Sequence, residues 1–169
     1  VGLKNVCHIE GGFTKWAAEK GQITEKPSGK SPAEKEGIYA LLPFVVNPEN
    51  IARFENGKVR IGDRRQYPFK KDYVTCESVD EVAQAIKDMV TQGSGPWMAA
   101  VNAMRIVAND GPAALKAARD TLVATRPTNP AMSLRLDEVL EAATLTQAQG
   151  TSVDDAIKNR IEAIKTTIY

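Results

Sequence analysis

The feature that most constrains the fold of this chain is the helical spacing of its apolar residues from residue 79 to the C-terminus. Successive segments carry an apolar residue at every third or fourth position, which places these side chains on one face of an α-helix. Helices are expected over residues 79–90, 96–108, from 112 onward, 131–148 and 153–168. Short connections between amphipathic helices predict an antiparallel five-helix bundle. In the first two helices the residues expected in the core are Val79, Val82, Ala83, Ile86, Met89, Val90, Trp97, Ala100, Val101, Met104, Val107 and Ala108.

Local signals mark the ends of these helices. Ser78 followed by Glu81 is a capping box, and Pro96 suits the first turn of a helix. Asn109-Asp110-Gly111 is expected to close the second helix, and Gly150 the fourth.

A β-hairpin is predicted upstream of the helices. Asn56-Gly57, the preferred pair for a type I′ turn, lies between two β-rich segments, residues 51–55 and 58–62. Residues 73–77 alternate in polarity and predict a third strand. The predicted fold class is therefore α+β and mainly α, with a small antiparallel β-meander followed by the five-helix bundle.

The chain is expected to have three parts. Residues 26–32 are rich in Pro, Gly and Ser and have the composition of a linker. We expect residues 1–26 to be the remnant of a separate domain, 27–50 the linker and 51–169 the main body. Because the chain starts at Val1 and its last helix reaches Tyr169 without a stop signal, both ends are expected to be truncated.

Composition narrows the function classes. The 169 residues are 43% hydrophobic and 25% charged, as in soluble globular proteins. With 22 basic and 21 acidic residues, the net charge of +1 gives no overall attraction to nucleic acid or membrane. The sequence shows neither a bilayer-spanning run nor a signal peptide, and its two cysteines follow no disulfide or metal spacing. We expect a cytoplasmic protein with no cofactor, no metal, no nucleic-acid partner and no membrane contact.

The residues offer little for catalysis. His8 is the only histidine, which excludes a Ser-His-Asp triad and a multi-histidine metal site. Cys7 precedes His8 on a predicted strand, so the two side chains point to opposite faces. Cys76 is expected to be a half-buried structural thiol, and Asp63 and Asp137 are candidate bases by residue type only. No catalytic residue is predicted.

One arrangement indicates binding of an anion. Gln92-Gly93-Ser94-Gly95-Pro96 opens a predicted helix, and Arg126-Pro127-Thr128 lies before a second turn. Backbone amides at a helix N-terminus and an arginine fork both suit a phosphate or carboxylate. The other interpretation is a helix start and a surface arginine. The predicted binding residues are Gly93, Ser94, Gly95 and Arg126. A basic cluster is interpreted instead as a solvated surface; it comprises Arg60, Arg64, Arg65, Lys70 and Lys71.

Residues 5–16 resemble the closing strand, turn and helix of a rhodanese domain. The active loop of that family lies upstream of this motif and is not in the chain. The resemblance therefore implies a C-terminal remnant over residues 1–26 and no sulfur transfer by this chain alone.

A second resemblance spans roughly residues 51–169. Residues 54–63 and 82–89 resemble the opening hairpin of methylthioribose-1-phosphate isomerase and the helix before its substrate loop. That family is related to ribose-1,5-bisphosphate isomerase and to the regulatory subunits of translation initiation factor 2B. Arg126 falls at the family's Arg-Pro-Thr motif, whose arginine helps to bind the sugar phosphate. The family loop reads Arg-Gly-Ala-Pro-Ala, so Gln92 replaces its arginine.

The resemblance implies the N-terminal, phosphate-binding part of a sugar-phosphate aldose–ketose isomerase of methionine salvage. The family's catalytic cysteine and aspartate lie in a C-terminal Rossmann-like domain that this chain lacks, so the chain alone is expected to be inactive. A sugar-phosphate ligand, that missing domain and homodimerisation of the full-length protein are the implied partners. The alternative is a non-catalytic regulatory or interaction module like the initiation-factor subunits, which the loss of the loop arginine favours.

Overall fold

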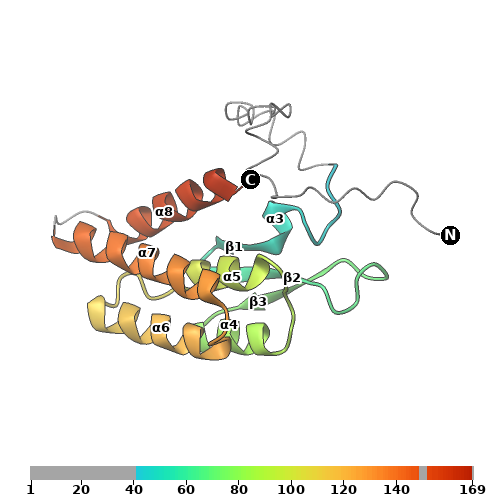
Figure 1. Cartoon of the computed structure of the whole chain (residues 1–169), viewed down its shortest axis with the longest axis horizontal. Helices are drawn as coiled ribbons and strands as arrows, with labels where there is room; N and C mark the ends of the chain where they lie inside the picture. The colour runs from blue at the N-terminus through green and yellow to red at the C-terminus, as the bar shows by residue number, and fades with distance from the viewer. Residues whose placement is uncertain (1–40, 149–151, 169) are drawn as a thin grey trace, which may run out of the picture. The chain divides into compact units, whose positions relative to one another are not determined.

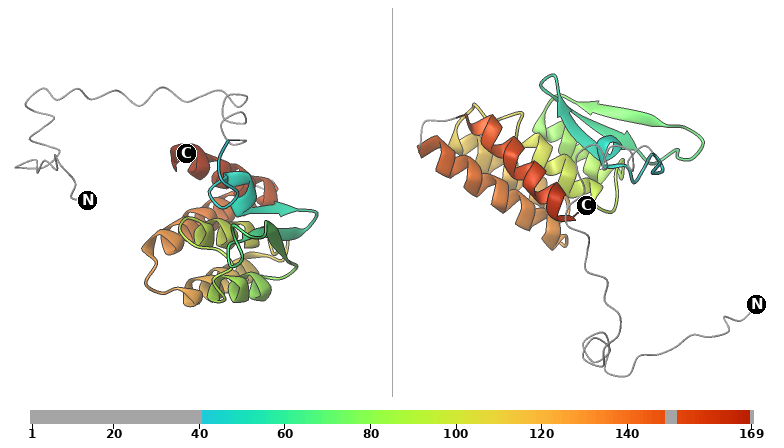
Figure 2. Two further views of the ribbon diagram at one scale, coloured as in Figure 1. Left: turned by 90° about the vertical axis from the view of Figure 1, so that its right-hand side faces the viewer. Right: turned by 90° about the horizontal axis from the view of Figure 1, so that it is seen from above.

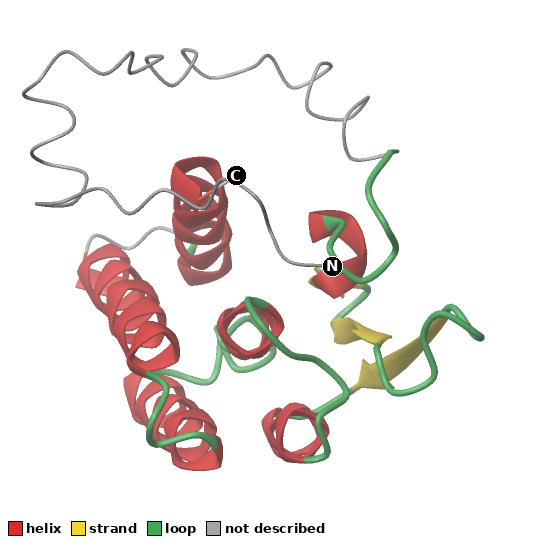
Figure 3. Ribbon diagram, turned by 45° about the vertical axis from the view of Figure 1, so that its right-hand side comes forward, coloured by secondary structure: helices red, strands yellow, loops and turns green. Residues whose placement is uncertain are grey.

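A computed structural model describes residues 41–148 and 152–168 of the protein (Figure 1). A short helix, α3 (Pro48–Ile51), leads into three strands, β1 (Ala52–Glu55), β2 (Lys58–Asp63) and β3 (Asp72–Cys76). Five helices follow: α4 (Val79–Lys87), α5 (Gly95–Ala103), α6 (Pro112–Thr125), α7 (Pro130–Ala148) and α8 (Val153–Ile168). Figure 3 shows the small sheet, with α3 beside it, on one side and the longer helices on the other. The predicted α+β, mainly α class, with a meander followed by five helices, is confirmed.

The sheet has the predicted antiparallel order β1-β2-β3. Phe54 lies opposite Val59 across the hairpin. Asn56 and Gly57 have φ values of 52° and 77°, the left-handed conformations that a type I′ turn requires. The hairpin and the third strand are therefore confirmed, with ends shifted by a residue or so from the predicted ones.

Helix α5 lies at the centre of the domain. All nine of its residues are buried, and it contacts the sheet and each of the other described helices. The prediction that this helix is amphipathic was wrong, because it has no solvent-facing side. Its predicted end was also wrong: regular helix stops at Ala103, since Arg105 and Ile106 donate to carbonyls three residues back instead of four.

Two polar contacts fix α5 to its neighbours. The buried Asn102 side chain accepts a hydrogen bond from the Phe54 amide (3.2 Å) and donates one to the Met98 carbonyl (2.8 Å). Just after the helix, Arg105 forms two 2.7 Å hydrogen bonds with Asp154 of α8. These contacts hold β1 and α8 against the central helix.

Helix α4 begins at the predicted cap and ends in a left-handed turn. The Ser78 hydroxyl accepts from the Glu81 amide (3.2 Å), whereas the Glu81 carboxylate accepts from the Glu77 amide (2.7 Å). Met89 has a φ of 59° and is 43% exposed, so its predicted place in the core was wrong. The left-handed residue turns the chain, and Val90 takes the buried position.

The remaining helices bury the predicted stripes against one another. The buried members are Leu115, Ala118, Leu122, Leu136, Val139, Ala143, Ile157, Ile161 and Ile164. Helix α8 packs chiefly on α7, and its buried isoleucines, Ile157, Ile161 and Ile164, belong to the core. Within the described ranges, no helix is long and apolar enough to cross a membrane.

The N-terminal end of the described chain packs on the sheet. Only residues 41–50 of the predicted linker are described. Phe44 is buried against the rings of Tyr67 and Tyr73, with centroid distances of 6.3 and 5.2 Å. The predicted rhodanese-like remnant, with Cys7 and His8, lies outside the described residues.

Candidate functional site

The glycine turn, residues 92–95, connects α4 to α5. Gly93 has a φ of 64°, and the Gly95 amide donates to the Gln92 carbonyl at 3.0 Å. Helix α5 begins at Gly95 with Pro96 in its first turn, as predicted. Gln92 and Gly93 are exposed and Ser94 is partly exposed. The turn therefore presents backbone to solvent at the positive end of a helix.

Gly95 differs from its neighbours in the turn because it is buried. A Cβ added here would stand 1.6 Å from the Oγ1 atom and 2.9 Å from the Cβ atom of Thr91, which is itself buried. The missing side chain at this position therefore makes room for Thr91, which gives Gly95 a packing role.

Arg64 is brought to the glycine turn by a backbone contact. Its amide, just after the end of β2, donates to the Val90 carbonyl at 2.9 Å. One guanidinium nitrogen, Nη1, lies 3.7 Å from the point where a Cβ on Gly93 would stand. Arg64 and the turn enclose a cavity of about 220 Å³, called here the Arg64 cavity. Its lining residues are Val45, Val46, Ile51, Arg64, Gln92, Gly93 and Ser94.

The other members of the basic cluster mostly have anionic partners. The Arg65 guanidinium makes a bidentate contact with Asp63, and this hydrogen bonding lowers the pKa of Asp63 below its ordinary value. Lys70 pairs with Asp72, and Arg60 lies over the Tyr73 ring at 4.2 Å.

Arg64 differs from Arg60, Arg65 and Lys70 in this respect. Its side chain makes no ion pair or hydrogen bond with the part of the chain that the structure describes. The interpretation of the cluster as a plain solvated surface missed this residue. The contact between the end of β2 and the start of α5 joins positions far apart in the sequence, and we find no local signal that would have indicated it.

Arg126 lies just before a turn, as predicted, but its side chain does not reach the glycine turn. It is the C-terminal cap of α6, and its guanidinium donates to the Ile86 carbonyl at 3.2 Å and contacts the Met89 sulfur. It does not line the Arg64 cavity. Of the four predicted binding residues, Gly93 and Ser94 line the cavity, Gly95 packs behind it, and Arg126 holds the end of the helix that leads into the turn.

The candidate acids and the thiol are occupied or inaccessible. Asp63 is paired with Arg65, and Asp137 accepts from Arg119 at 2.8 Å. Cys76 is fully buried where half burial was predicted, and burial, followed by the nearby Glu81 charge, raises the pKa of its thiol to about 11. The described residues contain no group of three or more His, Cys, Asp and Glu side chains placed to hold a metal ion. The described residues thus bring a guanidinium and a glycine turn together without an evident general base nearby.

Comparisons with known proteins agree with this architecture. No protein-family model matches the sequence. The chain is 34% identical over 113 residues to methylthioribose-1-phosphate isomerase 1 of Pseudothermotoga lettingae, an alignment that covers 61% of this chain and 32% of that protein. In structure it is similar to 5-methylthioribose 1-phosphate isomerase from Pyrococcus horikoshii (TM-score 0.59, 20% identity, 81% of this chain and 38% of that one). It is also similar to translation initiation factor eIF-2B, subunit delta, from A. fulgidus (TM-score 0.58, 24% identity, 68% of this chain and 36% of that one).

The described residues thus form a mainly helical domain whose fold also occurs in an isomerase and in an initiation-factor subunit. The chain is therefore similar in sequence to methylthioribose-1-phosphate isomerases, and similar in fold to such an isomerase and to an eIF-2B subunit. The chain spans about a third of the length of each of these relatives.

Proposed function

We propose that this domain is the phosphate-binding part of a sugar-phosphate isomerase related to methylthioribose-1-phosphate isomerase. The observation that carries the proposal is the guanidinium of Arg64, without an anionic partner in the described chain, beside Gly93 and Ser94 at the start of α5. A helix N-terminus and an arginine fork both favour a phosphate dianion.

Arg64 supplies the positive charge that the loop itself lacks. The family resemblance places an arginine at position 92, where this chain has Gln92. Arg64 approaches the neighbouring Gly93 from just after β2, where its amide is bonded to the Val90 carbonyl. Val45, Val46 and Ile51 form an apolar wall of the cavity, which suits the less polar part of a sugar phosphate.

Arg126 acts as a positioning residue in this scheme. By bonding to the Ile86 carbonyl it fixes the last turn of α4, and the chain enters the glycine turn a few residues later. Its loss is expected to act on the turn through α4 and not through direct contact with phosphate.

Isomerisation also requires proton or hydride movement between neighbouring carbons of the sugar. The described residues offer paired carboxylates and a buried thiol, which are poor candidates for that step. We therefore assign the chemical step to a further domain of a longer protein, Rossmann-like by the family resemblance. The 169-residue chain is expected to bind sugar phosphate without converting it.

A second candidate function is a regulatory or interaction module like the eIF-2B subunit. Two observations favour it: the loop arginine is replaced by Gln92, and Arg126 is engaged in holding α4. Such a module would not depend on Arg64 for binding of a phosphate.

Calorimetric titration with methylthioribose 1-phosphate tests the proposal. Arg64→Gln removes a charge-assisted contact worth about 1.5–3 kcal/mol, so affinity should fall roughly tenfold to a hundredfold. Gln92→Arg should raise the affinity. Arg160→Gln changes an arginine of α8 that pairs with Glu138 and does not line the cavity; it is the control and should leave the affinity unchanged. Equal affinity of the wild type and Arg64→Gln, or no binding by either protein, would contradict the proposal and favour the interaction module.

A further inference from the structure

The loop between β2 and β3, residues 64–71, holds an aromatic side chain out in solvent. Phe69 is 97% exposed, whereas Phe44 is buried in the core of the same region. Figures 1 and 2 show the loop projecting beyond the sheet, away from the helices. Its base is anchored, because the Tyr67 ring stacks on Phe44 and the Lys70 amide donates to the Gln66 carbonyl at 3.0 Å.

This anchored loop has the composition of a contact site. Phe69 leaves its ring almost wholly in water, and burial of that ring against a partner would be favourable. Lys70 and Lys71 follow it directly, and Lys71 has no carboxylate partner within the described ranges. The loop therefore offers an apolar ring followed by positive charge.

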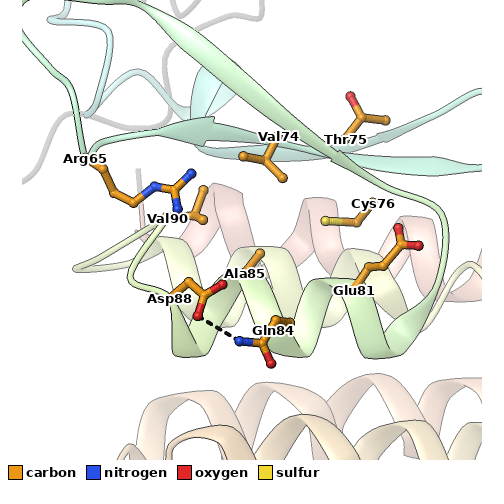
Figure 4. A pocket seen from close by; sticks show the side chains of 9 residues that line it. All are labelled: Arg65, Val74, Thr75, Cys76, Glu81, Gln84, Ala85, Asp88 and Val90. Atoms are coloured by element: carbon orange, nitrogen blue, oxygen red, sulfur yellow. Dashed lines mark hydrogen bonds between the residues drawn. The ribbon is translucent and has the colours of Figure 1, made fainter.

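A groove with complementary character lies between β3 and α4, with a volume of about 300 Å³. Figure 4 shows Val74 and Cys76 extending from β3 toward α4, with Glu81 toward one end and Asp88 toward the other. Ala85 and Val90 add to its apolar floor. The carboxylates of Glu81 and Asp88 accept hydrogen bonds from Glu77 and Gln84, and neither has an ion-pair partner among the described residues.

We infer that the β2–β3 loop of one copy of this chain docks into the β3–α4 groove of a second copy. The groove is large enough for a phenyl ring, and its floor is apolar. Arg65 also lines it, but this arginine is bound to Asp63. The carboxylates of Glu81 and Asp88 are therefore left to attract Lys71, since Lys70 is paired with Asp72. Phe69 does not fill the groove of its own chain, since it is almost fully exposed.

The arrangement can be reciprocal because the loop and the groove share strand β3. The loop enters β3 at Asp72, and Val74 and Cys76 of the same strand line the groove. Strand β3 is an edge strand, so two copies can meet along it about a twofold axis, each seating its loop in the other.

The contact depends on side chains more than on a continuous sheet. The Tyr73 amide at this edge is already bonded to the Asp72 carboxylate (2.9 Å), and the Glu77 amide to Glu81. Two loops and two grooves make a small interface, so the dimer is weak and concentration-dependent.

Sedimentation velocity of the full chain over a range of concentrations tests the inference. The wild type should show a monomer–dimer equilibrium. Phe69→Ser should lower the association constant about tenfold or more, because a buried aromatic ring becomes a small polar group. Gln84→Lys, at an exposed position beside the groove, should weaken association by repelling Lys70 and Lys71. Leu134→Ser, at a leucine of α7 that is 54% exposed, is the control and should have no effect.

A photo-reactive phenylalanine analogue at position 69 identifies the contact directly. In a mixture of isotopically light and heavy chains, crosslinks should join position 69 of one copy to residues 74–90 of the other. A chain that stays monomeric at all concentrations, or a dimer that persists unchanged in Phe69→Ser, would overturn the inference.

Discussion

Replacing Gly95 with alanine tests whether that glycine serves packing or ligand approach. The new Cβ would stand 1.6 Å from Thr91 Oγ1 and 2.9 Å from Thr91 Cβ. Rotation of the threonine relieves the first clash but not the second, so backbone must move. Such overpacking costs roughly 1–3 kcal/mol. In the opposite direction, alanine reduces the conformational entropy of the unfolded chain, which stabilises the folded state by about 0.4–1 kcal/mol.

Gly95→Ala is therefore expected to destabilise the domain, with the free energy of unfolding measured by urea denaturation. Combining it with Thr91→Ala should recover part of the loss, since the Oγ1 and Cγ2 contacts disappear. Gly111→Ala is the matched control: its φ is 93° and no atom lies within 4 Å of the added Cβ, so its cost should be independent of Thr91. A Gly95→Ala protein as stable as the wild type, with no coupling to Thr91, would refute the packing argument.

Three further predictions concern the contacts around α5 and α4. Asn102→Ala leaves the Phe54 amide without its acceptor and should cost about 1–3 kcal/mol in urea denaturation; an unchanged midpoint would contradict the role of that bond. Hydrogen bonding to Arg105 lowers the pKa of Asp154 in the folded protein. The ionised Asp154 therefore stabilises the fold above its unfolded-state pKa, and this stabilisation is lost as the pH falls through the folded-state pKa. In Asp154→Asn the stability should fall less steeply below about pH 4 than in the wild type. Arg126→Ala should lower the thermal midpoint by removing a bond to the end of α4, and a midpoint equal to that of Arg64→Gln would count against this assignment.

The elements that were predicted well are those with short-range signals. Asn56-Gly57 fixes its hairpin through two left-handed residues, and Ser78 with Pro96 marks the two helix starts. Turns and helix starts of this kind depend on the backbone preferences of adjacent residues, so they can be predicted from a short stretch of sequence. Apolar spacing likewise predicted the buried faces of α6, α7 and α8.

The errors arise where burial depends on contacts or bonds that the apolar spacing of a segment does not show. The central position of α5 depends on the sheet and the other described helices packing around it, which the spacing within one segment does not reveal. Met89 follows the helical stripe but lies after the helix has ended in a left-handed turn. Whether a residue continues a helix or caps it depends on the bonds that the next residues make.

Only part of the candidate site was predicted, because the rest of it depends on contacts between segments far apart in the sequence. The glycine turn and its position before α5 follow from composition, and the structure confirms that turn. The position of Arg64 beside the turn does not follow from the sequence, because it depends on a bond from the Arg64 amide, just after β2, to the Val90 carbonyl, after α4. Arg126 belongs to a recognisable local motif, yet its guanidinium donates a hydrogen bond to the Ile86 carbonyl of α4.

The most direct test of phosphate binding is a titration with inorganic phosphate followed by two-dimensional NMR of the labelled chain. Our account predicts saturable shifts of the Gly93 and Ser94 amides and of the Arg64 side chain, with little change at Arg126. The same titration of Arg64→Gln should need roughly tenfold more phosphate or more. Shifts that are absent at Gly93 and Ser94, or equal in the wild type and the variant, would contradict it.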